Sequence, residues 1–247
     1  MAVSRQNSSS AVKVKTPSTF AQYKTLLGKD LQQEFRTREM TTSMGIYALL
    51  VLIVYGAAMS QASSDLDVLQ LAGGLFWALV VFTSLLGLNR SFSHEKEQGC
   101  LEGILLVPLD RSVVFLAKAT SNLLFLIAVE VVAVPLFWFF FLANVQLASS
   151  AACALPVLLV GSVGIAGVGT LLSTITVNTR GKDVMLAVLF IPLIFPLLYA
   201  CVSATTAVLV GAEGCMDTFT TAMALATGYD VIMILLGWVL YDFVISA

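Results

Sequence analysis

The stretch VVFLAKATSNLLFLIAVEVVAVPLFWFFFL, residues 113–142, is mainly apolar and carries only two charged residues, Lys118 and Glu130. A helix needs about 20 mainly apolar residues to cross a bilayer, because every backbone N–H and C=O group must be bonded within the segment. This stretch is long enough, and it lacks the period-two alternation of a membrane barrel strand. It therefore predicts a transmembrane helix.

The rest of the chain repeats this pattern. Hydrophobic residues make up 58% of the 247 residues and charged residues 11%, whereas soluble domains are about 45–50% apolar. The expected spans lie near residues 43–60, 69–88, 113–142, 151–177, 184–210 and 229–246. We therefore expect an all-α integral membrane protein with six transmembrane helices, in which residues 43–247 form the membrane domain.

The basic residues all fall on one side of this six-span arrangement. Seven precede the first expected span, and the other six are Arg90, Lys96, Arg111, Lys118, Arg180 and Lys182. By the positive-inside rule, both termini and the loop between the second and third spans face the cytoplasm. The opposite loops are short and exclude a receptor ectodomain, and the net charge of −2 argues against a nucleic-acid partner.

The segment before the first span has two parts. Residues 1–18 are rich in serine and lysine and free of acids, which predicts a disordered cytoplasmic tail, although a transit peptide shares this composition. Residues 19–42 predict an amphipathic helix. Its apolar residues recur at helical spacing: Phe20, Tyr23, Leu27, Leu31 and Phe35. Such a helix lies either along the membrane interface or in solvent against its own protein.

The loop EKEQGCLEGILLVPLDRS, residues 95–112, predicts a short cytoplasmic helix over residues 95–108. Leu101, Ile104 and Leu105 share one face, and glutamates gather near the helix start, where negative charge is favourable. Gly99 bends its entry and Pro108 stops it. The apolar face either docks into a groove of a soluble partner or rests at the interface without one.

This loop resembles the coupling-helix signature of ABC exporter permeases of the second type. The resemblance is closest to the haem exporter protein B (CcmB) family, the membrane subunit of the cytochrome c maturation ABC transporter, and it runs from about residue 23 to 244. "LLGKDLQQEFRTRE", "NRSF" and "FIPLIFPLL" add to it. The resemblance implies an ATPase-coupling set of Glu97, Gly99, Leu101, Glu102, Ile104, Leu105 and Pro108. It also implies a half-helix over residues 217–228, with Asp230 at the end of the last span.

The same resemblance implies a function and partners. The chain is expected to be a permease subunit that couples ATP hydrolysis by a separate ABC ATPase to haem delivery, or to release of a haem-loaded chaperone. It would work with a second copy of itself and other cytochrome c maturation membrane proteins, in the bacterial inner membrane rather than an organellar one. A generic exporter of lipid or polysaccharide, or a membrane scaffold without transport, are the alternatives.

No catalytic or cofactor site is indicated in this chain. The sequence has no G-x-x-x-x-G-K-[ST] phosphate-binding loop, so ATP belongs to the partner subunit and haem to the wider complex. His94 is expected to be solvated. The scattered cysteines give neither a disulfide framework nor a paired metal site: Cys100, Cys153, Cys201 and Cys215.

Three intramembrane features remain. Glu130 is the deepest acid, and because an unpaired charge in lipid is costly, it should face the bundle or a polar cavity, or be protonated. Glu130 has either a functional role or a structural one, in which it is hydrogen-bonded to a neighbouring helix. The glycine-rich run at residues 161–169 indicates close helix packing rather than a nucleotide loop. Four prolines are expected inside spans, where they kink helices: Pro135, Pro156, Pro192 and Pro196.

The charge pattern gives a direct topology test. In a variant without other cysteines, a cysteine at Glu213 should react with a membrane-impermeant thiol reagent added outside, because the acidic loop faces outward. A cysteine at Lys182 should react only after the membrane is opened. Labelling of position 182 from outside would contradict the six-span arrangement.

Overall fold

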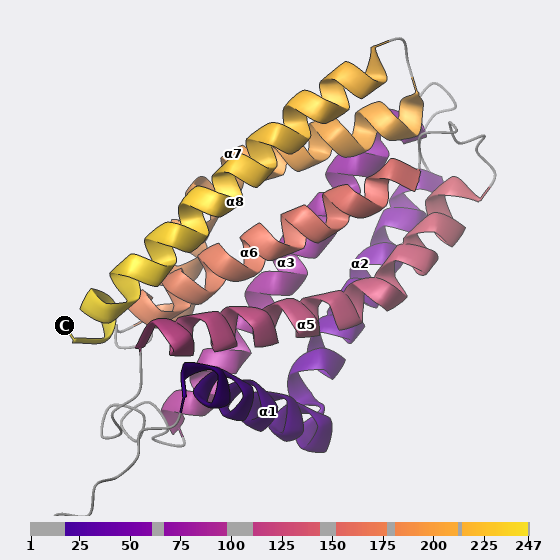
Figure 1. Ribbon diagram of the computed structural model, residues 1–247. Helices are drawn as coiled ribbons and strands as arrows, with labels where there is room; N and C mark the ends of the chain where they lie inside the picture. Colours follow the sequence, from indigo (N-terminus) through magenta and orange to yellow (C-terminus); the bar gives the residue numbers. More distant parts are fainter. Residues whose placement is uncertain are drawn as a thin grey trace, which may run out of the picture.

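The structure is a computed structural model that describes residues 18–60, 67–97, 111–143, 152–176, 181–211 and 214–246, and long helices dominate them (Figure 1). Six of these helices are long and apolar enough to span a membrane, which confirms the all-α membrane fold. The elements are α1 Thr19–Thr37, α2 Glu39–Ser60, α3 Val68–Glu97, α5 Arg111–Phe137 with its π-helical continuation η1 Trp138–Leu142, α6 Ala154–Thr176, α7 Lys182–Val210 and α8 Cys215–Ser246.

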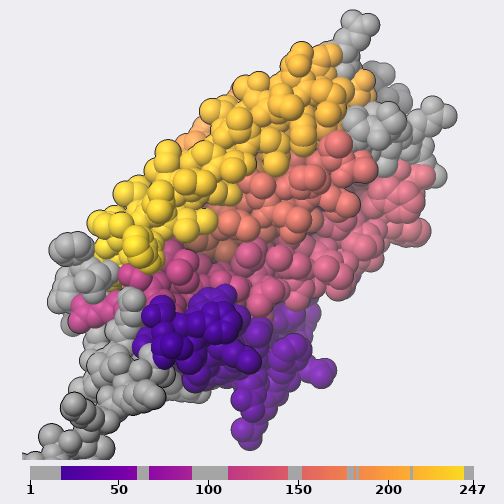
Figure 2. Space-filling model, in the orientation of Figure 1, coloured from indigo at the N-terminus to yellow at the C-terminus, as the bar shows by residue number. Residues whose placement is uncertain are grey.

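The long helices run back and forth, so the bundle has two ends. We call the end where α3 finishes and α5 begins the loop end, and the opposite end the distal end. Helix α1 lies across the loop end against the first half of α5, as Figures 1 and 2 show. Helix α6 contacts α3, α5, α7 and α8. Helix α6 is one of the two most buried spans and packs against four others, so we call it the central helix, and it has to accommodate neighbours on several sides.

Glycines make that central position possible. A methyl group added to Gly161 would collide with the ring of Trp77 on α3, and one added to Gly169 would collide with Leu88, also on α3. One added to Gly164 would collide with the carboxylate of Asp230 on α8. Small residues allow helices to approach closely in lipid, where no hydrophobic force drives them together. The packing interpretation of residues 161–169 is confirmed.

A tight corner joins α1 to α2. Helix α1 ends at Thr37, Arg38 adopts a left-handed conformation with φ 52°, and α2 starts at Glu39, four residues before the expected first span. The Glu34 carboxylate accepts a hydrogen bond from the Thr41 backbone N–H at 2.7 Å. This bond satisfies one of the free donors at the start of α2, so it fixes the angle between the two helices.

The C-terminal region differs from the expected half-helix followed by a separate span. Helix α8 continues without a break from Cys215 to Ser246, so the boundary expected between residues 228 and 229 is wrong. Glycine inside a helix costs only about 1 kcal/mol relative to alanine, so Gly228 does not interrupt a run held by packing on both sides. As a consequence, Asp230 lies in the middle of the last span and is buried, with 5% of its surface exposed.

The prolines also behave differently from one another. Pro135 lies inside α5, and Pro192 and Pro196 lie inside α7, as expected. Pro156 instead occupies the first turn of α6, where a missing N–H donor removes no helical bond, so the expectation of an interior proline there is wrong. The π-helical turn η1 begins three residues after Pro135, and it lies at the distal end.

The glycine packing predicts the effect of a single methyl group. Gly161→Ala should lower the melting temperature in lipid nanodiscs, because Trp77 is 1% exposed, its indole is hydrogen-bonded to Thr205, and overpacking typically costs about 1–3 kcal/mol. Gly74→Ala on α3 is the matched control, since a methyl group there meets nothing within 4 Å. It should leave the melting temperature unchanged or raise it; equal losses in both variants would contradict this packing.

Candidate functional site, a polar seam along helix α5

The structure describes both flanks of the expected coupling helix. Residues 95–97 continue α3, so Glu97 is its last residue. The other residues of the predicted coupling set lie in 98–110, outside the described residues: Gly99, Leu101, Glu102, Ile104, Leu105 and Pro108. Helix α5 begins at Arg111, directly after this loop. Any displacement of the loop would therefore reach the bundle first through α3 and α5.

Helix α5 carries a line of polar side chains toward the membrane interior. We call Lys118, Ser121, Asn122 and Glu130 the α5 polar seam, and all four are buried. Lys118 and Asn122 lie one turn apart on the same side of the helix, and Glu130 lies about two turns further on, so the line of polar residues winds gradually around α5. A polar group buried in a lipid-facing bundle needs a partner, and each of these side chains has one on a neighbouring helix.

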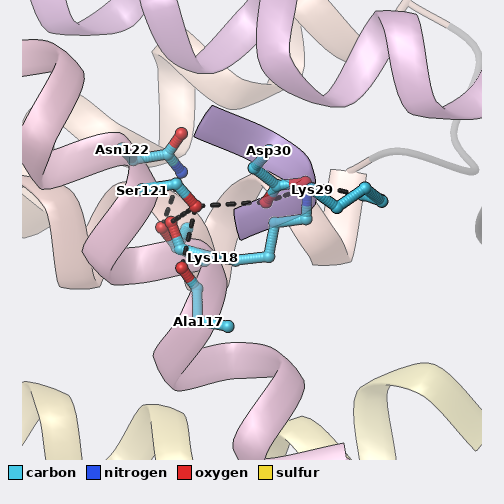
Figure 3. A network of polar contacts seen from close by, with 7 residues as sticks. Lys29, Asp30, Ala117, Lys118, Ser121 and Asn122 are labelled. Atoms are coloured by element: carbon cyan, nitrogen blue, oxygen red, sulfur yellow. Dashed lines mark hydrogen bonds and ion pairs between the residues drawn. The ribbon is translucent and has the colours of Figure 1, made fainter. Parts of the chain in front are cut away.

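At the loop end, the seam holds α1 (Figure 3). The Lys118 ammonium lies 3.0 Å from the Asp30 carboxylate, and Ser121 Oγ donates a hydrogen bond to the same carboxylate at 3.1 Å. Lys29 approaches the other carboxylate oxygen at 3.4 Å. The side chains of Lys118 and Asp30 are 8% and 9% exposed, so this ion pair is shielded from solvent. We call Asp30, Lys118 and Ser121 the α1 clasp.

A second hydrogen bond supports the clasp. The Tyr23 hydroxyl donates to Thr120 Oγ1 at 3.1 Å, two turns of α1 before Asp30. Helix α1 therefore faces α5 with Gln22, Leu26 and Asp30, while Phe20 and Phe35 are each 75% exposed. Asp30 is not one of the apolar residues that predicted this helix, yet its side chain is turned toward α5, where its carboxylate neutralises the buried Lys118.

Deeper in the bundle, the seam joins α5 to the central helix α6. Asn122 Nδ2 donates to Thr170 Oγ1 at 2.9 Å, and Ser162 Oγ donates to Glu130 Oε1 at 2.7 Å. The two contacts are eight residues apart on each antiparallel helix, which is about 12 Å along the axis. Two side-chain hydrogen bonds at this spacing fix both the register and the rotation of α5 against α6.

Two buried acids lie on different sides of one turn of α6. Glu130 approaches from α5 at Ser162, and Asp230 approaches from α8 at Gly164. One oxygen of each carboxylate, Glu130 Oε2 and Asp230 Oδ1, has no hydrogen-bond partner among the described residues. Glu130 faces the bundle, as its desolvation cost requires, but it is not the sole deep acid. The sequence reasoning missed Asp230 because it placed that residue at a helix end.

The described residues hold no group of three side chains that could ligate a metal ion. Three cysteines are free thiols in separate places: Cys153 just before α6, Cys201 on α7 and Cys215 at the start of α8. His94 lies near the end of α3, and its side chain falls outside the described part of the chain. The chemistry that the α5 polar seam offers is hydrogen bonding and charge neutralisation between helices.

One signal for the α1 clasp was present in the sequence. Lys118 stands in an apolar run beside Ser121 and Asn122, and a lysine in that setting requires an acid partner. The partner itself could not be chosen, because Asp30 is 88 residues earlier and two other acids, Glu34 and Glu39, lie in the same part of the chain. Only the docking of α1 identifies it.

The comparisons with known proteins agree on one family. A family model described as "CcmB protein" matches residues 21–242. The chain is 27% identical over 177 residues to a protein named Heme exporter protein B from Pseudomonas aeruginosa, covering 70% of this chain and 75% of that one. It is 31% identical over 151 residues to a protein of the same name from Bradyrhizobium diazoefficiens, covering 60% and 65% respectively.

The α1 clasp predicts that loss of one charge releases α1 and that loss of both charges restores its docking. Lys118→Met should release α1, because removing one partner of a buried ion pair costs about 3–5 kcal/mol and leaves the Asp30 charge to Lys29, which lies 3.4 Å away and is 40% exposed. Hydrogen–deuterium exchange of residues 19–37 should rise strongly. The double variant Lys118→Met with Asp30→Leu should restore most of the protection, since both charges are gone.

Lys24→Met is the matched control for the clasp. Lys24 is exposed on α1 and its loss should leave the exchange unchanged. If Lys118→Met leaves the exchange of α1 unchanged as well, the ion pair does not hold this helix.

Proposed function

Because the chain belongs to the CcmB protein family, we propose that it is the permease subunit of an ABC transporter that serves cytochrome c biogenesis. The observation that carries this proposal is the family match over residues 21–242, which includes every membrane helix except the last turn of α8. The two relatives named Heme exporter protein B point to haem as the molecule handled by the complex. Six apolar helices are the architecture that such a subunit requires.

The energy source would be a separate subunit. The sequence lacks the phosphate-binding loop through which ABC ATPases hold ATP, so this chain would convert a partner's motion rather than hydrolyse ATP. The coupling helix expected within residues 95–108 is the contact for that partner. Two copies of the chain would present two coupling helices, one to each member of an ATPase pair.

The α5 polar seam supplies a route for the motion. A displacement of the coupling loop would move the start of α5, because Arg111 follows the loop directly. The α1 clasp would carry α1 along with α5, and the Asn122 and Glu130 contacts would pass the displacement to α6. Helix α6 touches four other long helices, so a rotation of α6 would be felt through the bundle.

The output that we propose is mechanical. The relatives' names refer to haem export, and the chain would use ATP-driven motion to deliver haem or to release a haem-loaded chaperone from an associated membrane complex. Other cytochrome c maturation membrane proteins and the haem chaperone are therefore its proposed partners. The inner membrane of a bacterium is the proposed location, with both termini in the cytoplasm.

The coupling helix provides the sharpest test. Leu105→Asp places a charge on the apolar face that would fill the ATPase groove, and loss of one buried anchor costs about 2 kcal/mol or more. Glu102→Lys reverses a charge at the same contact and should weaken docking. Both variants should insert into the membrane, yet retain less ATPase on co-purification and form less cytochrome c in cells.

Gln98→Ala is the control for these two variants, because it changes an uncharged side chain ahead of the apolar face. It should retain both the ATPase and cytochrome c formation. If the two coupling-face variants also retain full ATPase binding and full maturation, the loop has no coupling role. If they lose the ATPase while cytochrome c formation stays normal, the chain serves a different ABC exporter.

A further inference from the structure

The distal end of the bundle contains an apolar cavity of about 170 Å³. Its walls come from the first turns of α3, the last turn of α5 with η1, the first turns of α6 and the last turns of α7. We call it the distal cavity. It lies at the end of the bundle opposite the coupling loop. The α5 polar seam ends close to it, because two lining residues, Val134 and Leu158, lie one helical turn from Glu130 and Ser162 toward the distal end.

The lining of the distal cavity is suited to hydrocarbon. Of its twelve lining residues, all but Thr205 are aliphatic or aromatic. The Thr205 hydroxyl already accepts the Trp77 indole N–H at 3.0 Å. A cavity of this kind does not hold water, which needs two to four polar partners, whereas an apolar cavity of about 150 Å³ is known to take up benzene or xenon.

The distal cavity opens sideways, toward the surface that would face lipid. Trp138 on η1 and Leu155 on α6 line it, and they are 51% and 59% exposed. Both lie on candidate membrane spans, so their exposed parts would be surrounded by acyl chains. Among the described residues, these two side chains connect the cavity lining with the lipid-facing surface, so an acyl chain would reach the cavity along them.

The composition of the bilayer indicates which molecule would occupy the distal cavity. Acyl chains are the solvent at this depth, so even a weak preference for the cavity would keep it filled by mass action. An empty void forfeits the dispersion contacts of its walls, and an acyl chain in the cavity restores them. We propose that the distal cavity holds one acyl chain of a phospholipid from the leaflet opposite the coupling loop, as a resident ligand.

Such a ligand would brace the centre of the bundle. Trp77 forms one wall of the cavity and packs on Gly161 of α6, next to the Ser162 that holds Glu130. A chain pressed against Trp77 would keep that ring seated on α6. The lipid site lies within the chain itself and does not depend on the proposed function.

Tryptophan quenching by brominated phospholipid tests the proposal directly. The chain has three tryptophans, and Trp138→Phe with Trp238→Phe leaves Trp77, which is 1% exposed and out of reach of lipid on the outer surface. The full-length protein is reconstituted in nanodiscs of dioleoyl phosphatidylcholine or its dibrominated form. Trp77 should be quenched by the brominated chains, because the occupant lies beside the wall to which its ring belongs.

Variants in which a larger side chain fills the distal cavity are the matched control for this measurement. Adding Ala154→Phe, or the smaller change Val134→Leu if the first variant does not fold, should abolish most of the Trp77 quenching. A protein that keeps only Trp238, which is 47% exposed on α8, reports surface lipid and should be quenched equally with and without the filling substitution. Native mass spectrometry should find about one retained phospholipid per chain, lost on filling.

Two results would overturn the proposal. If Trp77 is not quenched while Trp238 is, no acyl chain enters the cavity. If Trp77 quenching persists unchanged in both folded filling variants, the bromines reach it by a route other than the distal cavity.

Discussion

The interior of a bilayer offers a polar side chain no water, and the pairing of α5 with α6 is arranged around that constraint. Asn122 and Glu130 each carry a group that must be bonded, and Thr170 and Ser162 meet them at the same spacing on the facing helix. The register between the two helices is therefore set by hydrogen bonds, since apolar contacts alone would tolerate sliding. Four membrane helices pack on α6: α3, α5, α7 and α8. The positions of α3, α7 and α8 relative to α5 therefore depend on this register.

Glycine and polar residues act together on α6. The glycines at 161, 164 and 169 admit Trp77, Asp230 and Leu88 from two different helices. Between them, Ser162 and Thr170 face α5. Close approach without a bond would leave the rotation of α6 undefined, and bonds without close approach would leave voids. The combination gives one central helix a fixed orientation toward four neighbours.

At the loop end the helices are held by an ion pair, whereas deeper in the bundle they are held by side-chain hydrogen bonds. Lys118 is tolerated at the edge of the membrane since Asp30 neutralises it and Ser121 completes the site. The cost of burying two charges is recovered only if both are held in good geometry, so the pair gives α1 one preferred docking position. The exposed pair of Arg90 with Glu39, at 2.7 Å between α3 and α2, contributes little by comparison. The part of α5 that follows the coupling loop is thus tied to α1, and its deeper part to α6.

The sequence alone determined the fold class, the number of spans, the amphipathic helix before them and the family resemblance, because hydropathy over about 20 residues and the loop motif are local properties. It identified Glu130 as a buried acid for the same reason. It did not predict the partner of Lys118, the burial of Asp230 or the unbroken α8, since each depends on which face of a helix meets another helix. A boundary at Gly228 looked plausible in the sequence, but packing on both sides of that residue outweighs the small cost of a glycine. Tertiary structure decided these points because polar groups in lipid take whichever partner the packing brings within reach, at any distance along the chain.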